Sequence, residues 1–380
     1  MTLSPPAKVR FEDCKVLASG IDKLDLSIDV SWPNNDLFKY LDDLKAYAKS
    51  IDEPTDGLLI TKDQSHEYKF NIRPHGSPGY TWLLGSNDYS LSIANTLEQK
   101  SRPSVFANIS SEALWRMGNR EAVNWLTNLI SGIGGSINSV KPSRVDLCND
   151  TMFPLSLWNK DLIDYLVSRA LKRDLHFYGN KFTGLSVGMG GKICFRIYDK
   201  PHEIATKSKK NWMYDAWGIN QVPKGMIILR SEFQIRREAL RSLGVNFIEE
   251  LFEKEPNVWA YSSLKWLKFQ DNPGKHHNQR HTFPWWEVVQ GGYRGSQGAV
   301  PSIRQKAFKA DQISLIQEID GFIASHMALM IEKQGIHLDH TLTIDDLVQN
   351  YLRERRNIGN NLRDVDGNVR KKLANHNRVK

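Results

Sequence analysis

Residues 23–29, Lys-Leu-Asp-Leu-Ser-Ile-Asp, and residues 144–150, Arg-Val-Asp-Leu-Cys-Asn-Asp, decide the fold of this chain. Each stretch begins with a basic residue and carries an aspartate at its third and seventh positions. In the first stretch apolar and polar side chains alternate, which is typical of a strand with one buried face. Two matching strands this far apart indicate that one structural unit occurs twice in the sequence.

The segments that follow these two strands also correspond. Each strand precedes a stretch with helical spacing of apolar residues, at 35–51 in the first copy and 156–172 in the second. Each copy closes with Glu-Ala-Leu and then a glycine where a helix would end, at residues 112–118 and 238–244. The strands predicted between these helices are residues 68–72, 81–85 and 88–93 in the first copy and residues 176–178, 183–188 and 192–198 in the second.

This order of elements predicts an α+β fold. Each copy of the duplicated unit would form a mostly antiparallel sheet with helices on one face. We predict a first repeat at residues 1–135, a second repeat at 136–250 and a mainly helical C-terminal region at 251–380. Within that region, residues 307–333 and 344–355 have the patterns of helices.

The composition is that of a globular protein with a polyanionic partner. Of the 380 residues, 40% are hydrophobic and 25% are charged, which is ordinary. The formal net charge is +8, and residues 353–380 hold nine Lys/Arg against three Asp/Glu, which favours contact with phosphates. Because no apolar stretch is long enough for a membrane helix and no secretory signal opens the chain, we expect a cytoplasmic protein without a membrane partner. The three scattered cysteines argue against a disulfide framework or a zinc ribbon.

The second copy carries the candidate site. Residues 195–200 read Phe-Arg-Ile-Tyr-Asp-Lys, and residues 229–237 read Leu-Arg-Ser-Glu-Phe-Gln-Ile-Arg-Arg. Because alternate residues of a strand share a face, each segment would display a row of polar and ionisable side chains. Burying such a face in an apolar core would be costly, so we interpret it as functional. The rows are Arg196, Tyr198 and Lys200 on the first segment, and Arg230, Glu232, Gln234 and Arg236 on the second.

The first copy lacks these groups. In the alignment of the two copies, Asn95 stands where the second copy has Tyr198, and Phe106 stands where it has Glu232. We therefore predict that the first copy is degenerate and serves for support or DNA contact.

The residue types of the second copy suggest phosphodiester chemistry. Asp146 and Glu232, with Asp150 as a further candidate, would supply oxygen ligands for Mg²⁺ or Mn²⁺, and the metal would polarise a phosphodiester. A tyrosine hydroxyl attacking phosphorus would give a covalent phosphotyrosine and a free 3′-hydroxyl. Arg196 and Lys200 would favour the phenolate and hold the phosphate.

These segments resemble the replication initiation factor family, the trans-acting Rep proteins of rolling-circle plasmids and filamentous phages, with related relaxases of conjugative elements. The resemblance covers about residues 17–244 and is most specific in the strands of Tyr198 and Glu232. It implies nicking and rejoining of one strand of origin DNA, a divalent metal held by acidic residues, and recruitment of a host helicase. The roles that it implies are nucleophile for Tyr198, metal ligands for Asp146 and Glu232, and phosphate binding for Arg196, Lys200 and Arg230.

The expected partners are double-stranded and single-stranded origin DNA, and a homodimer is possible. The residues predicted to contact DNA are Arg144, Arg230, Gln234 and Arg236. Residues 185–191 only approximate the Tyr-x-Gly-Ser turn of related sequences, so Tyr178 and Tyr214 remain alternative nucleophiles. A conjugative relaxase with the same chemistry and a non-catalytic origin-binding protein remain alternative functions.

Two further enzyme classes receive less support from the sequence. In nucleases with paired histidines, the two ligands flank one hydrophobic residue, but residues 337–340 read His-Leu-Asp-His. No glycine-rich loop ends in Gly-Lys-Ser or Gly-Lys-Thr, so the sequence offers no support for intrinsic ATPase activity.

Overall fold

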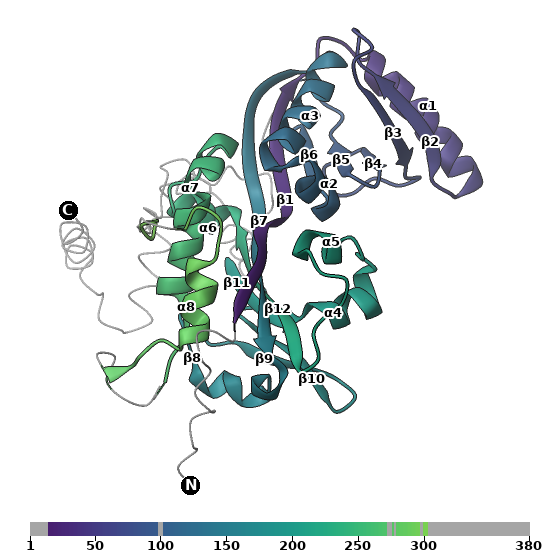
Figure 1. Cartoon of the computed structure of the whole chain (residues 1–380). Coiled ribbons are helices and arrows are strands. Elements are labelled where there is room, and N and C mark those ends of the chain that lie inside the picture. Colours follow the sequence, from purple (N-terminus) through teal and green to yellow (C-terminus); the bar gives the residue numbers. More distant parts are fainter. Residues whose placement is uncertain (1–13, 98–101, 272–275, 277–278, 297–298, 303–380) are drawn as a thin grey trace, which may run out of the picture. The chain divides into compact units, whose positions relative to one another are not determined.

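A computed structural model describes residues 14–97, 102–271, 276, 279–296 and 299–302 (Figure 1). These residues form a large antiparallel sheet with packed helices, so the predicted α+β class is confirmed. The helices predicted at 307–333 and 344–355, the histidines at 337 and 340, and the basic segment 353–380 lie outside the described residues. No helix in the described part is long and apolar enough to cross a membrane.

Two long strands, β1 (Lys15–Ser31) and β7 (Ser136–Pro154), form the centre of the 11-stranded sheet. Strands of the first copy extend the sheet beyond β1, and strands of the second copy extend it beyond β7. A separate pair joins β8 (Leu166–Ser168) to β13 (Leu267–Phe269). Across the large sheet the order is β2 (Thr55–Ile60), β3 (Glu67–Ile72), β4 (Trp82–Gly85), β5 (Tyr89–Ile93), β6 (Val105–Ile109), β1, β7, β12 (Met226–Arg236), β11 (Ile193–Asp199), β10 (Lys181–Val187) and β9 (Arg173–Tyr178).

The strand order is symmetric about the β1–β7 pair except for β2, which has no counterpart beyond β9. Leu24 lies opposite Val145, and Asp25 lies opposite Arg144, so the two matching stretches of sequence run antiparallel beside each other. Counted outward from this pair, β6 corresponds to β12, β5 to β11, β4 to β10 and β3 to β9. This is the arrangement that a duplicated unit produces when its two copies join through their first strands.

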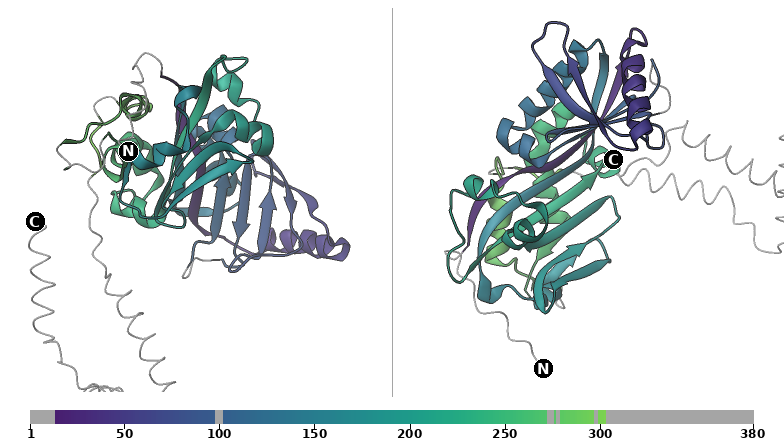
Figure 2. Two further views of the ribbon diagram at one scale, coloured as in Figure 1. Left: turned by 90° about the horizontal axis from the view of Figure 1, so that it is seen from below. Right: turned by 90° about the vertical axis from the view of Figure 1, so that its right-hand side faces the viewer.

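Helices of both copies pack on the same apolar face of the sheet (Figure 2). In the first copy, Phe38 of α1 lies 4.8 Å from Trp82 between ring centroids. On the other half of the sheet, Trp259 of α7 (Ile248–Tyr261), which follows the second copy, lies 5.3 Å from Phe233 between ring centroids. The helices of this layer are α1 (Asp36–Ile51), α2 (Ser111–Met117), α3 (Asn119–Gly132), α6 (Arg237–Ser242), α7 (Ile248–Tyr261) and α8 (Pro284–Gly291).

Burial of alternating side chains explains why these segments are strands. Leu24, Leu26 and Ile28 of β1 and Val145 and Leu147 of β7 are all 0% exposed. Removing one such side chain from water contributes about 1.5–3 kcal/mol, so the alternation read from the sequence determines which face of each strand is buried.

One helical segment packs on the opposite face of the sheet and corrects the prediction that helices occupy one face only. It connects β11 to β12 and comprises α4 (Lys200–Glu203), the π-helical turn η4 (Ile204–Ser208) and α5 (Met213–Trp217). Its buried residues form a small second core with Ile228 of β12. In the first copy the corresponding connection, residues 94–104, contains no described helix. We call residues 200–217 the α4–α5 arm.

Two further expectations differ from the structure. The helix predicted at 156–172 is wrong: two short 3-10 turns, η2 (Leu155–Leu157) and η3 (Lys160–Tyr165), precede β8. A 3-10 turn places residues i and i+3 on one side, so its apolar spacing resembles that of a helix. Residues 251–302 were predicted to start a separate region, yet those of them that the structure describes belong to one compact unit with the two repeats.

Candidate active site

The predicted polar rows meet on one face of three neighbouring strands. Arg196 of β11 lies opposite Glu232 of β12, and Tyr198 lies opposite Arg230. On the other side of β12, Arg230 lies opposite Asp150 of β7, and Gln234 lies opposite Asp146. We call this surface the polar face; it comprises Arg144, Asp146 and Asp150 of β7, Arg230, Glu232, Gln234 and Arg236 of β12, and Arg196 and Tyr198 of β11.

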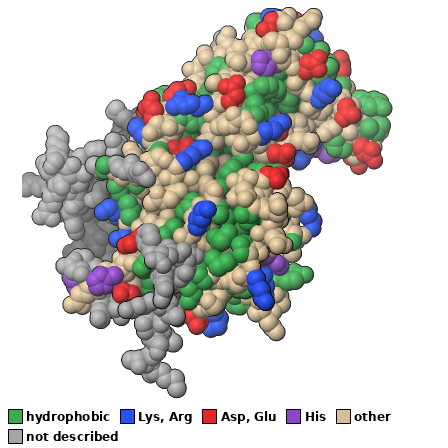
Figure 3. Space-filling view, viewed as in Figure 1, with side chains coloured by type: hydrophobic (Ala, Val, Ile, Leu, Met, Phe, Trp, Pro, Cys, Tyr) green, Lys and Arg blue, Asp and Glu red, His purple; other side chains and the backbone are tan. Residues whose placement is uncertain are grey.

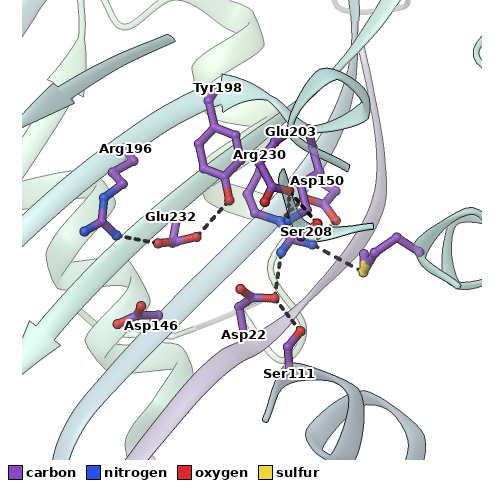
Figure 4. A network of polar contacts seen from close by, with 12 residues as sticks. Asp22, Ser111, Asp146, Asp150, Arg196, Tyr198, Glu203, Ser208, Arg230 and Glu232 are labelled. Carbon is purple, nitrogen blue, oxygen red and sulfur yellow. Dashed lines mark hydrogen bonds and ion pairs between the residues drawn. The ribbon is translucent and has the colours of Figure 1, made fainter. Parts of the chain in front are cut away.

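Glu232 occupies the centre of the polar face (Figure 4). Its Oε2 accepts a hydrogen bond from the Tyr198 hydroxyl at 3.1 Å, and its Oε1 lies 2.7 Å from Arg196 Nη1. The second guanidinium nitrogen of Arg196 donates to Gln234 at 2.9 Å. Glu232 and Gln234 are only 5% and 4% exposed, whereas Arg196 and Tyr198 are partly exposed. The phenol is therefore held against a carboxylate at the edge of solvent.

A second carboxylate, that of Asp146, lies beside Glu232 (Figure 4). Arg144 pairs with it through two nitrogens, with Nε donating at 2.8 Å. Burial and the negative charge of Glu232 nevertheless raise the pKa of Asp146 to about 6. Each of the two buried carboxylates has one arginine partner, so the raised pKa of Asp146 reflects its burial first and the neighbouring Glu232 second.

Asp150 and Arg230 form a separate buried cluster. Nε and Nη2 of Arg230 each lie 2.7 Å from an oxygen of Asp150, and Trp217 Nε1 donates to the same carboxylate at 2.8 Å. Nη1 of Arg230 donates to Asp22 of β1 at 2.7 Å. Although burial opposes it, the charge of Asp150 holds the pKa of Arg230 well above its usual value.

This cluster corrects two predicted roles. Asp150 does not join Asp146 and Glu232 as a metal ligand, because residues four apart on a strand are about 13 Å apart and the Asp150 side chain is 0% exposed. Arg230 does not present its guanidinium to DNA, because its side chain is 0% exposed. Both residues instead join the two repeats and the α4–α5 arm.

Lys200 is likewise engaged inside the protein. Its side chain is 2% exposed and its Nζ lies 2.6 Å from Glu203, so it is not placed to hold a substrate phosphate as predicted. Burial and the charge of Glu232 raise the pKa of Tyr198 well above its usual value, with Arg230 opposing. That Arg196 and Lys200 favour the phenolate stays a prediction: each is paired with a carboxylate, and Lys200 Nζ lies 5.7 Å from the centroid of the Tyr198 ring.

Of the other residues predicted to contact DNA, one is buried and two are at least partly exposed. Gln234 is buried against Arg196, whereas Arg236 is exposed and Arg144 is partly exposed. Arg144 and Arg236 line a groove of about 680 Å³ where the two repeats meet. On the face seen in Figure 3, basic and acidic side chains are scattered singly, so the net charge of +8 marks no binding surface there. The residues that line this junction groove are Asp25, Phe106, Ser143, Arg144, Gly190, Gly191, Lys192, Arg236, Arg237 and Glu238.

The strand registers give the counterparts of the site in the first copy. Phe106 lies opposite Ser27 of β1 as Glu232 lies opposite Cys148 of β7, which agrees with the sequence alignment. The position of Tyr198 is taken by Ala94 and not by the predicted Asn95, because the Ala94 amide continues the ladder by donating to Ser104. The first copy thus has neither the phenol nor the central carboxylate.

The alternative nucleophiles lie in different surroundings. Tyr178, at the end of edge strand β9, is 67% exposed, and its ring lies 5.1 Å from the ring of His202. Tyr214 packs against Trp217 in the small second core. Of these three tyrosines, Tyr198 is the one whose hydroxyl donates to a carboxylate of the polar face.

Sequence reasoning missed two residues that shape this site. Asp22 reaches Arg230 because the β1–β7 register shifts between Ile21 and Lys23, and strict alternation does not predict such a bulge. Gly184 of β10 lies opposite Tyr198, and a Cβ there would come within 2.7 Å of the Ile197 carbonyl oxygen and 2.9 Å of Tyr198 Cβ. A glycine in a predicted strand was the available signal for this close approach.

The acidic residues fit a two-carboxylate cation site better than a three-carboxylate one. In the described ranges, no group of three or more His, Cys, Asp or Glu residues is arranged to hold a metal ion. Mg²⁺ is commonly held by one or two carboxylates together with substrate phosphates, and Asp146 with Glu232 would provide such a pair if the ion displaced their partners Arg144 and Arg196. No family model matches the sequence, and no curated protein matches it.

Proposed function

We propose that this protein nicks and rejoins one strand of DNA at a replication origin through a covalent bond to Tyr198, as a rolling-circle initiator does. The observation that carries the proposal is the hydrogen bond of 3.1 Å from the Tyr198 hydroxyl to Glu232. A conjugative relaxase would use the same chemistry in a different biological setting. Recruitment of a host helicase, a homodimer and a cytoplasmic location remain predictions.

Glu232 is the proton acceptor in this mechanism. A general base must lie within hydrogen-bond reach of the proton that it removes, and Glu232 Oε2 meets that condition. As the Tyr198 oxygen bonds to phosphorus, its proton passes to Glu232, and the bond from phosphorus to the 3′-oxygen breaks. The 3′-oxygen takes a proton from water, and rejoining reverses these steps.

Positive charge near the reacting phosphate would come from two partly exposed arginine side chains. The side chains of Arg196 and Arg144 are 28% and 26% exposed, so both guanidinium groups border solvent beside the two carboxylates. A Mg²⁺ or Mn²⁺ ion held by Asp146 and Glu232 would stabilise negative charge on the phosphate oxygens. Below about pH 6, binding would displace the proton of Asp146, because the pKa of this carboxyl is raised to about 6.

The proposal is tested with supercoiled origin plasmid and Mg²⁺ or Mn²⁺. We expect the parent protein to give open-circle DNA and a protease-sensitive covalent adduct, Tyr198→Phe to give no adduct, and Glu232→Gln to slow its formation by about 10²–10⁴-fold. Tyr178→Phe and Tyr214→Phe are the matched controls and should react like the parent. An adduct in Tyr198→Phe would remove Tyr198 as nucleophile.

A non-catalytic origin-binding protein is the second candidate. Specific contacts favour it: Arg196, Lys200 and Arg230 are each paired with a carboxylate, and the pKa of Tyr198 is raised rather than lowered. Binding of the parent protein to origin DNA without nicking in either metal would support this candidate and contradict the first.

A further inference from the structure

The junction groove described above overlaps one end of the polar face, since Arg144 and Arg236 belong to both. On β12, Arg230 lies opposite Tyr198, and Arg236 lies six residues further along the same strand at the groove. Six strand residues span about 20 Å, which is long enough for several nucleotides of an extended strand. A DNA strand that reaches Tyr198 along this face therefore passes the groove.

The groove combines cations with weak internal pairing. Arg236 is exposed and makes no salt bridge with another described residue. Arg237 donates to the backbone carbonyl of Asn246 at 2.8 Å, so its charge is not neutralised by a carboxylate there. Lys192 pairs with Glu238 at 2.6 Å on the surface, where such a pair is worth little and is readily exchanged for a phosphate contact.

The first copy contributes an aromatic ring to the same groove. Phe106 is partly exposed and lines the groove at the position that Glu232 occupies in the second copy. Its ring centroid lies 6.4 Å from that of Tyr80. A solvent-accessible aromatic ring beside cations, as Phe106 is in part, is the combination on which proteins stack unpaired bases while holding the backbone.

We propose that the junction groove binds a single-stranded segment of the DNA next to the cleavage site, with Arg236 on a phosphate and Phe106 stacked on a base. This inference rests on the proposed function for its substrate. It assigns the degenerate copy a role in substrate binding, separate from the chemistry at Tyr198.

The test measures binding of a fluorescent single-stranded oligonucleotide by anisotropy, in the Tyr198→Phe background so that no strand is cut. Phe106→Ala should weaken binding roughly 5- to 150-fold, the range for loss of one stacked base, with an unchanged salt dependence. Arg236→Ala should weaken binding and make the slope of log affinity against log salt shallower by about 0.7, the value for one lost contact to a single strand.

Matched variants separate these effects from general damage. Phe106→Trp should retain binding, and Arg236→Lys should retain the salt slope. Phe177→Ala, which removes an exposed ring on β9, and Lys39→Ala, which removes an exposed charge on α1, should leave binding unchanged. Circular dichroism of each variant checks that it is folded.

The outcomes distinguish this inference from the proposed function. If Phe106→Ala leaves the affinity unchanged and Arg236→Ala leaves the salt slope unchanged, the junction groove does not bind the strand as proposed. This conclusion would hold even if Tyr198 forms the adduct. The expected losses in a protein whose parent form never nicks would support the groove and contradict the nickase. Equal losses on duplex DNA would overturn base stacking, because bases of a duplex are not free to stack on Phe106.

Discussion

Asp146 is the residue of the site whose charge depends most directly on pH near neutrality. Its carboxyl pKa is raised to about 6 by burial and by Glu232, from an ordinary value of 3.8. Well below pH 3.8 the carboxyl is protonated in both the folded and the unfolded protein, so no free energy is spent on a buried charge. Above about pH 6 it is ionised in both, and the folded state carries the full cost of that buried charge.

The substitution Asp146→Asn should therefore stabilise the folded protein, relative to the parent, increasingly as pH rises. Relative to the parent, its free energy of unfolding should increase by on the order of 2 kcal/mol between pH 4 and pH 7, because a shift of one pKa unit corresponds to about 1.4 kcal/mol. Urea unfolding at pH 4, 5.5 and 7 measures this, with Asp161→Asn as the exposed control. A difference that stays constant with pH would show that Asp146 ionises normally.

Gly184 is the residue that permits β10 to pass close to Tyr198. Gly184→Ala would place a Cβ 2.7 Å from the Ile197 carbonyl oxygen, so β11 would have to move. We expect a loss of about 1–3 kcal/mol of stability, as for other overpacked sites, and a slower adduct reaction. Gly85→Ala on β4, where a Cβ meets nothing within 4 Å, is the control. Equal stability of the two variants would contradict this account.

At the scale of elements, the Arg230 cluster joins β1, β7, β12 and the α4–α5 arm. Arg230 contacts Asp22 of β1, Asp150 of β7 and the Sδ atom of Met213 in α5. Because the guanidinium is fully buried, removing one partner leaves an uncompensated charge.

Arg230→Met should cost about 3–5 kcal/mol of stability, because Asp150 then remains buried without its cation and keeps only the hydrogen bond from Trp217. Replacing both partners, as Arg230→Met with Asp150→Leu, should recover part of that loss. A double-mutant cycle by chemical denaturation measures the coupling. Additive effects would mean that the two charges do not depend on each other.

Prediction from sequence succeeded where the pattern is local. Alternation identified β1, β7, β11 and β12, and the repeated stretches predicted which strands correspond. Residues 156–172 were misassigned because 3-10 turns and helices share an i, i+3 spacing. The location of Tyr198 and Glu232 on one face followed from alternation. The pairing of Asp150 with Arg230 did not, because it depends on register between strands distant in sequence.

At the scale of the whole described unit, both repeats share one sheet and one core. β1 and β7 pair along most of their length, so neither copy completes its sheet alone. Elements that share a core and a hydrogen-bonded ladder are expected to unfold together.

Substitutions in either copy should thus shift one common unfolding transition. Leu26→Ala in β1 and Leu147→Ala in β7 each remove a fully buried side chain, and each should cost about 2–5 kcal/mol. Calorimetry with residues 14–302 intact should show both variants shifting the same peak. Two separate peaks, with each variant shifting only one, would mean that the copies fold independently.

The symmetric pairing of β1 with β7 has the geometry by which two identical subunits meet across a two-fold axis. Here both partners belong to one polypeptide, so their association does not depend on protein concentration. A mutation can also change one partner and leave the other as it was. An aromatic ring can therefore replace the carboxylate in one half while the other half keeps it, which two subunits encoded by the same short gene could never do.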